Sequence, residues 1–120
     1  MYKVRHYIKN NGRCPIEEFL INLEPKLRAK AFHDIEILQE YGTRLNGSYM
    51  KSIKGKKYKG LYELRIKFSN DIARIFYFTY YNQEIILLNG FIKKTMKTPK
   101  RELDRAKRYM DDFIRRRENG

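Results

Sequence analysis

The sequence has one cysteine, no tryptophan and two histidines. A lone cysteine, Cys14, cannot form an internal disulfide, so nothing points to an oxidising compartment. The N-terminal segment MYKVRHYIKNNGR lacks the apolar core of a signal peptide. No apolar run reaches the roughly 18 residues that a membrane-spanning helix needs. These absences lead us to expect a cytoplasmic protein.

Motifs for metal and nucleotide chemistry are also missing. His6 and His33 lie far in sequence from any cysteine pair or paired-carboxylate motif, so no zinc or two-metal spacing is formed. The sequence has no phosphate-binding glycine loop, no nucleophile elbow and no dinucleotide fingerprint. We therefore expect no metal and no cofactor, and neither metal-dependent nor triad hydrolysis is supported.

Acidic residues are scarce relative to basic ones. The chain holds 27 Lys and Arg against 14 Asp and Glu, a net charge of +13. A small domain with this charge attracts polyanions from a distance. Binding to an anionic membrane requires a basic helix with a broad lipid-facing apolar stripe, and the helices predicted below need their stripes for a core. Nucleic acid is therefore favoured over membrane, and a charged solubility coat is the remaining interpretation.

The length and the hydrophobic content predict a single domain over residues 1–120. Helices are expected to start at Pro15, Pro25 and Pro99, and the second is expected to close at Gly42. Alternating or continuous apolar patterns predict strands over 2–8, 49–53, 61–68, 72–80 and 84–92. We expect an α+β fold in the order β-α-α-β-β-β-α. A mostly antiparallel twisted sheet would be packed by a helical hairpin and a C-terminal helix.

The cations concentrate in two stretches of the sequence. Residues 51–67 hold seven Lys or Arg with Glu63 as their one acid, and residues 93–108 hold eight more. A solvated charge coat would spread over outer helix faces, whereas many of these cations fall on predicted strands and adjoining loops. Strand alternation places Arg65 and Lys67 on the same face as Glu63.

Arg74 interrupts the apolar strand IARIFYF. A buried charge without a partner is costly, so this arginine needs an ion pair or an anionic ligand. One interpretation is an ion pair with Glu63 across the predicted hairpin. The other is a guanidinium presented to phosphate, and the two are compatible.

Such a cluster has a use in RNA cleavage without metal. The 2′-OH of RNA can attack the adjacent phosphate if the protein aligns the chain, assists proton transfer and stabilises the added negative charge. Arginine and lysine provide fixed donors for that charge. Glu63, the one carboxylate among these cations, is a conceivable base. A passive nucleic-acid-binding surface would have a similar composition, so both alternatives stay open on these grounds.

Four segments carry a family resemblance: CPIEEFLINL, IKG with GLYELRI, ARIFYF, and ILLNGFIKKTMKTPKRELDRA. Together they resemble the RelE/ParE toxin superfamily and, within it, the HigB-like branch related to phage Gp49. The resemblance covers nearly the whole chain, and the GFIKKT…TPKRE block is specific. The predicted order of helices and strands agrees with that fold.

The resemblance implies the toxin of a type II toxin–antitoxin pair, an endoribonuclease that cleaves mRNA on the translating ribosome without metal. Its partners would be mRNA, the ribosome and a HigA-like helix-turn-helix antitoxin. The matching positions imply catalytic roles for Lys54, Glu63, Arg65, Arg74, Lys93 and Lys94. The RNA backbone would be held by Lys56, Lys57, Lys59, Lys67 and Lys97. Asn89 departs from the branch, because many relatives have a histidine there, which leaves the general acid and base unassigned.

Two alternatives remain from other functional classes. A ParE-like toxin would have the same fold, no nuclease site, and DNA gyrase as its target. A non-catalytic nucleic-acid-binding module would bind RNA in a salt-sensitive way without arresting growth. The cations at positions 54, 65, 74, 93 and 94 favour the endoribonuclease over the gyrase inhibitor.

Overall fold

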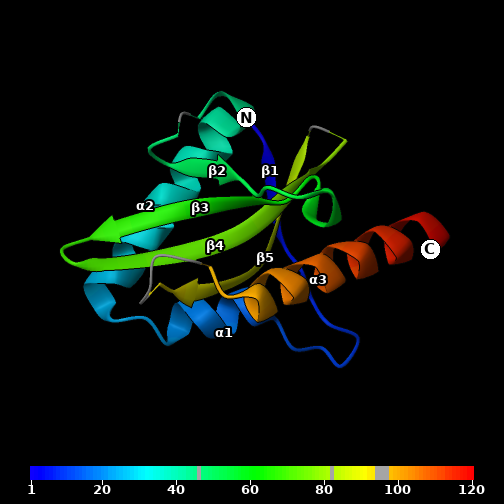
Figure 1. Ribbon diagram of the computed structural model, residues 1–120, viewed down its shortest axis with the longest axis horizontal. Coiled ribbons are helices and arrows are strands. Elements are labelled where there is room, and N and C mark those ends of the chain that lie inside the picture. The colour runs from blue at the N-terminus through cyan, green and yellow to red at the C-terminus, as the bar shows by residue number, and fades with distance from the viewer. Residues whose placement is uncertain (46, 82, 94–97) are drawn as a thin grey trace.

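The computed structural model describes residues 1–45, 47–81, 83–93 and 98–120 and confirms the predicted α+β class (Figure 1). Its helices and strands are β1 Lys3–His6, α1 Pro15–Ile21, α2 Pro25–Tyr41, β2 Met50–Ser52, β3 Tyr62–Phe68, β4 Asp71–Tyr80, β5 Glu84–Ile92 and α3 Lys100–Asn119. Single-turn 3₁₀ helices occupy Gly42–Arg44 and Lys56–Tyr58. The strand predicted over 49–53 is present as the short β2, so four strands follow α2, one more than the predicted order β-α-α-β-β-β-α counts.

The strands form one sheet in the order β1-β5-β4-β3-β2. β1 runs parallel to β5 and the other neighbours are antiparallel, so the prediction of a mostly antiparallel sheet is confirmed. β5 carries a bulge, because Phe76 pairs with Asn89 whereas the next residue, Tyr77, pairs with Leu87. β1 pairs with β5 as far as Leu87, just before the bulge, and is shorter than the predicted 2–8.

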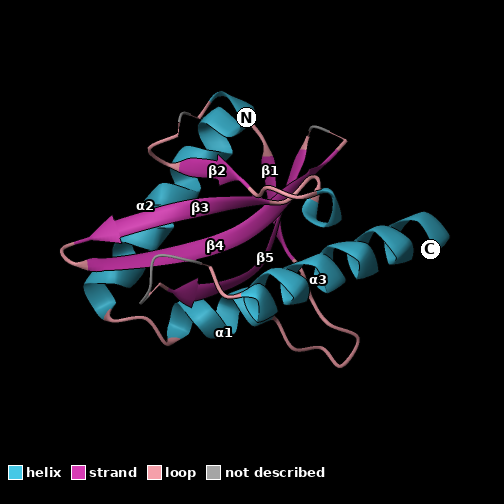
Figure 2. Cartoon of the chain, in the orientation of Figure 1, coloured by secondary structure: helices cyan, strands magenta, loops and turns pink. Residues whose placement is uncertain are grey.

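Helices cover both faces of the sheet (Figures 1 and 2). The hairpin of α1 and α2 packs on one face, where Leu20 and Leu38 are buried with Ile75. α3 packs on the other face, where Ala106 and Met110 contact a cluster that includes Phe76. The predicted inner stripes of these helices are thus confirmed. Among the described residues, no helix is both long and apolar enough to traverse a bilayer.

The helix ends follow from local sequence. Pro15 and Pro25 begin their helices as predicted, at positions where the missing N–H costs nothing. α2 ends before Gly42, whose φ of 51° and contact with the Tyr2 ring leave no room for a Cβ. The prediction for α3 was wrong by one residue: Pro99 is the extended residue before the helix, and Lys100 begins it.

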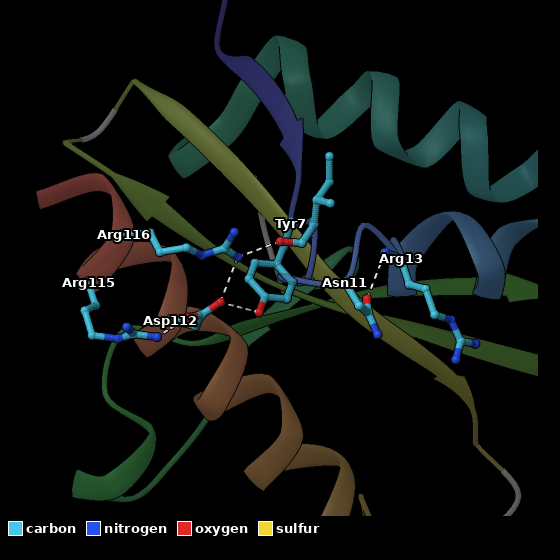
Figure 3. Close-up of polar contacts among 7 residues, drawn as sticks. Tyr7, Asn11, Arg13, Asp112, Arg115 and Arg116 are labelled. Carbon is cyan, nitrogen blue, oxygen red and sulfur yellow. Dashed lines mark hydrogen bonds and ion pairs between the residues drawn. The ribbon is translucent and has the colours of Figure 1, made fainter. Parts of the chain in front are cut away.

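Tyr7 ties α3 to the end of β1 (Figure 3). Its hydroxyl donates to Oδ2 of Asp112 at 2.6 Å, and the same oxygen lies 2.7 Å from Nη2 of Arg116. Arg116 also donates to the Ile8 carbonyl at 2.5 Å, and Arg115 pairs with the other carboxylate oxygen. Burial and the Asp112 carboxylate raise the pKa of Tyr7 to about 12. These contacts fix the direction in which α3 crosses the sheet.

Gly90 lets α1 approach β5 closely. A Cβ at this position would lie 2.5 Å from a ring carbon of Phe19 and 2.9 Å from the backbone oxygen of Arg74. We expect Gly90→Ala to lower the free energy of unfolding by about 1–3 kcal/mol, because backbone must move to admit the methyl group. Urea denaturation measures this change. Gly47→Ala is the control, since nothing lies within 4 Å of its added Cβ; equal losses in both variants would contradict the packing argument.

Candidate functional site

Several predicted cations meet on the α3 face of the sheet, toward the β3–β4 hairpin. Glu63 and Arg65 share this face of β3, and Arg65 lies directly opposite Arg74 on β4. Lys93 follows β5 and donates its backbone N–H to β4 at 2.8 Å. α3 begins short of the hairpin (Figure 1), and it packs on the apolar part of this face. We call Glu63, Arg65, Arg74 and Lys93 the cationic cluster.

Glu63 joins the two arginines. It is 1% exposed, and its Oε1 accepts a hydrogen bond from Nη1 of Arg74 and lies 3.7 Å from Nε of Arg65. The ion pair expected across the hairpin is therefore present. The second carboxylate oxygen and the Nε atoms of both arginines are buried and have no hydrogen-bond partner among the described residues. Buried donors on charged groups normally make hydrogen bonds, so the two Nε donors could bind the oxygens of an incoming anion.

The cluster carries more positive charge than its one carboxylate neutralises. Like charges directly opposite each other on neighbouring strands repel, and Arg65 and Arg74 stand in that relation. Burial and the nearby Arg74 lower the pKa of the Lys93 ammonium, Lys51 and Arg65 add to the effect, and Glu63 opposes it. A bound phosphate would supply the missing negative charge.

The sequence did not identify Lys51 as a site residue. It lies on β2 opposite Glu63 and contributes to the lowered pKa of Lys93. The strand predicted over 49–53 contained a partial signal, because it placed Lys51 on a strand and not in a loop. Which β3 residue it would face depends on the register between β2 and β3, and this register could not be read from the sequence.

The other predicted cations are dispersed. Lys67 is exposed on the same β3 face as Arg65. Lys54, Lys56 and Lys59 are exposed in the segment between β2 and β3. None of these four forms an ion pair within the described part of the chain. Lys94 and Lys97 lie outside the described residues.

Lys57 is held by α3. Its ammonium lies 2.9 Å from Oδ1 of Asp104, and the Tyr58 hydroxyl donates to the same oxygen at 2.6 Å. The hydrogen bond with Asp104 stabilises the charged ammonium and thereby raises the pKa of Lys57. This contact attaches the lysine-rich segment to the start of α3. Lys57 is thus engaged in a structural ion pair.

Asn89 is 3% exposed, and neither its amide nitrogen nor its amide oxygen has a hydrogen-bond partner among the described residues. It lies opposite Phe76, which in turn lies opposite Glu63 on β3. Asn89 therefore occupies the row of the sheet that also contains Glu63, on the far side of β4. An amide cannot take up and release protons as a histidine does, so its contribution is hydrogen bonding.

The structure brings His6 next to two other potential metal ligands, Cys14 and Glu17. The sequence had shown no metal-ligand spacing around either histidine. The ligand atoms of the three residues all lie within 4.8 Å of one another, since β1 ends beside the start of α1. His6 Nδ1 is 3.2 Å from Oε1 of Glu17. Burial raises the pKa of the Cys14 thiol, which favours the protonated form over the thiolate that binds metals. We assign no metal to this group.

Comparison with known proteins gives a family match. The model of a family described as phage-derived protein Gp49-like matches residues 18–111. The matched span contains β3, β4 and β5 and therefore the whole cationic cluster. No curated protein matches the chain significantly.

Proposed function

Because the chain belongs to the phage-derived Gp49-like family, a toxin-like family of the RelE type, we propose that it is the toxin of a type II toxin–antitoxin pair. The proposed activity is metal-independent, ribosome-dependent cleavage of mRNA. One observation carries this proposal: Glu63 binds two arginines whose buried Nε donors have no hydrogen-bond partner among the described residues, and Lys93 lies beside them. That arrangement is suited to a phosphate whose negative charge increases during reaction.

The reaction would proceed by attack of the RNA 2′-oxygen on the adjacent phosphorus. The O2′–P bond forms and the P–O5′ bond breaks, leaving a 2′,3′-cyclic phosphate on one product and a 5′-hydroxyl on the other. One proton leaves the 2′-oxygen and one reaches the 5′-oxygen. Arg65 and Arg74 would bind the non-bridging oxygens, where charge accumulates in the transition state.

Lys93 would supply the proton to the departing 5′-oxygen. Its pKa is lowered by burial and by the neighbouring cations, which makes the ammonium a better acid than an exposed lysine. Glu63 was predicted as a conceivable base, but its burial and its contact with Arg74 favour another role. We assign Glu63 as a positioning residue that holds both guanidinium groups in place.

The exposed cations would hold the RNA outside the reacting phosphate. Lys51 faces Glu63 across the β2–β3 pair, and Lys67 extends the same face toward the hairpin. Lys54, Lys56 and Lys59 would contact the backbone of mRNA or ribosomal RNA. A HigA-like helix-turn-helix antitoxin would neutralise the protein in this scheme.

Brief induction in growing cells tests the proposal. New 5′-hydroxyl ends should appear in mRNA, and they should disappear when translation is blocked before induction. Gyrase-linked DNA breaks without mRNA cleavage would instead establish a ParE-like inhibitor. Salt-sensitive RNA binding without mRNA cleavage, without DNA breaks and with normal growth would instead indicate a passive nucleic-acid-binding module.

Lys93 should make RNA binding pH-dependent. Only the ammonium form attracts phosphate, and the pKa of Lys93 is lowered, so binding should weaken at a lower pH than an ordinary lysine would allow. We expect the affinity for a non-cleavable 2′-deoxy oligonucleotide to fall with rising pH, and to do so before an exposed lysine, whose pKa is about 10.4, would lose its charge. Fluorescence anisotropy measures the affinity. Lys93→Arg should remove the decrease in affinity, because the arginine guanidinium stays charged over the pH range in which a lysine loses its charge. The same decrease in the variant and the wild type would show that another group causes it.

A further inference from the structure

The outer edge of β5 lacks a neighbouring strand over part of its length. β1 pairs with residues 84–87 of β5, and no described strand pairs with the edge beyond them. The backbone N–H of Lys93 points to β4, and pointing directions alternate along a strand. The N–H and C=O groups of Gly90 and Ile92 therefore point outward. An open edge of this kind is a template for pairing with another extended chain.

A groove of about 600 Å³ runs along this edge between two helices. Phe19 of α1 and Leu23, just beyond the end of that helix, form one wall, and α3 forms the other with Arg105 and Arg108. Arg65, Arg74 and Lys93 are not among its lining residues. The groove is therefore a separate surface from the cationic cluster, on the opposite side of β5 from β4.

The two walls differ in chemistry. The α1 wall offers apolar side chains, and Ile92 at the floor is 39% exposed. The other cations that line the groove are Lys9 and Arg13. Among the described residues that line the groove, the one acid is Glu18, which forms an ion pair with Arg13 at 2.7 Å. An occupant should therefore be apolar toward α1 and acidic toward α3.

Asn89 also lines the groove. Its amide is buried, and it makes no hydrogen bond with any described residue. A buried polar group without a hydrogen-bond partner destabilises the fold. A polar group supplied by an occupant of the groove would offset that cost, which is a second indication that something binds here.

We propose that the groove binds an extended segment of a partner protein in which acidic and apolar residues alternate. The segment adds to the sheet as a strand along Gly90 and Ile92. Side chains of a strand alternate between its two sides, so the acidic ones face Arg105 and Arg108 while the apolar ones face α1. A second copy is a poor occupant, because each chain carries a net charge of +13.

RNA phosphates could form ion pairs with the arginines of the groove, but RNA could not form hydrogen bonds along the edge of the sheet as a strand does. Its backbone offers no alternating N–H and C=O groups to pair with those of Gly90 and Ile92. This distinction separates the docking surface from the phosphate site, and the proposal does not depend on endoribonuclease activity. The folded protein alone is sufficient for the test.

The probe is a fluorescein-labelled peptide of about eight residues in which Glu and Val alternate. Two further peptides carry N-methyl groups, one on every Glu amide and the other on every Val amide. In an added strand, one of these two sets points at β5. We expect one methylated peptide to lose at least about tenfold in affinity and the other to bind like the parent. Anisotropy measures all three on the wild-type protein, so this test needs no variant.

Two variants locate the site. Ile92→Pro removes an outward N–H without breaking the β4–β5 pairing, and Arg108→Glu reverses a charge on the α3 wall. Each should weaken binding of the parent peptide by at least about tenfold. The controls are Ile92→Val and Lys26→Glu, the latter an exposed position on α2. Circular dichroism establishes that each variant is folded.

Amide hydrogen exchange gives the most direct readout. On binding of the parent peptide, exchange at Gly90 and Ile92 should slow, whereas exchange at Phe91, already paired with β4, should stay slow. Equal binding of both methylated peptides would overturn strand addition. Displacement of the peptide by an RNA oligonucleotide whose own affinity falls in Ile92→Pro would assign the groove to RNA. Peptide-independent dimerisation that is lost in Ile92→Pro would assign it to a second copy.

Discussion

Arg74→Ala is expected to abolish growth arrest and to reduce mRNA cleavage by about a thousandfold or more. Arg74 is 6% exposed and shares the Glu63 carboxylate with Arg65. Its guanidinium is therefore held in place before any phosphate arrives, and no reorganisation is needed as charge develops. Mapping of 5′-hydroxyl ends after induction, with equal protein levels, measures the effect in cells.

The alanine variant also leaves Glu63 buried without its strongest partner, so a loss of activity needs a folding control. The double variant Glu63→Gln with Arg74→Gln keeps two polar side chains of similar size and removes both charges. We expect it to be folded and inactive. Arg74→Lys retains the charge but loses the planar pair of donors, and it should keep only a small part of the activity. A folded double variant that cleaves mRNA at the wild-type rate would exclude this site.

Glu63→Ala is expected to destabilise the fold by about 3–5 kcal/mol. The carboxylate is buried between two arginines that lie directly opposite each other on β3 and β4. Its removal leaves an uncompensated buried charge on Arg74 and repulsion between the arginines. Urea denaturation at neutral pH measures the change in the free energy of unfolding.

Replacing both charges should recover most of that stability. A buried ion pair exchanged for apolar residues of similar volume is often neutral in stability, so Glu63→Leu combined with Arg74→Leu should fold nearly as well as the wild type. Lys107→Ala is the surface control, because its pair with Asp111 at 2.6 Å is solvent-exposed and worth at most about 1 kcal/mol. A loss in Glu63→Ala no larger than in Lys107→Ala would refute the bridging role of Glu63.

Local patterns accounted for most of the fold. The alternation of residues 61–68 and the proline-initiated helices predicted β3, α1 and α2 because side-chain period and helix capping act over a few neighbouring residues. Long-range pairing was less accessible. The position of β1 beside β5 and the bulge before Asn89 depend on contacts between distant segments, and no local pattern encodes them.

The candidate site was predictable in composition and less so in arrangement. Arg65 and Arg74 were named from the sequence, and a hairpin between their strands implied that they were neighbours. Their direct opposition depends on the tight turn at Ser69, where φ is 56°. Lys51 was missed because β2 is short, and Lys57 was assigned to RNA although Asp104 of α3 binds it. These partners come from other elements and could not be inferred from one segment.

The place of β5 in the sheet has a consequence for the order in which the chain matures. β5 is the last strand to be synthesised, yet it lies between β1 and β4 and pairs with both. β1, whose Lys3 pairs with Glu84, therefore waits for its partner until the intervening helices and strands have been made. Such distant pairing slows folding. A nascent chain would consequently lack the complete cationic cluster until β5 and Lys93 have been made, and the β5 groove until α3 has followed.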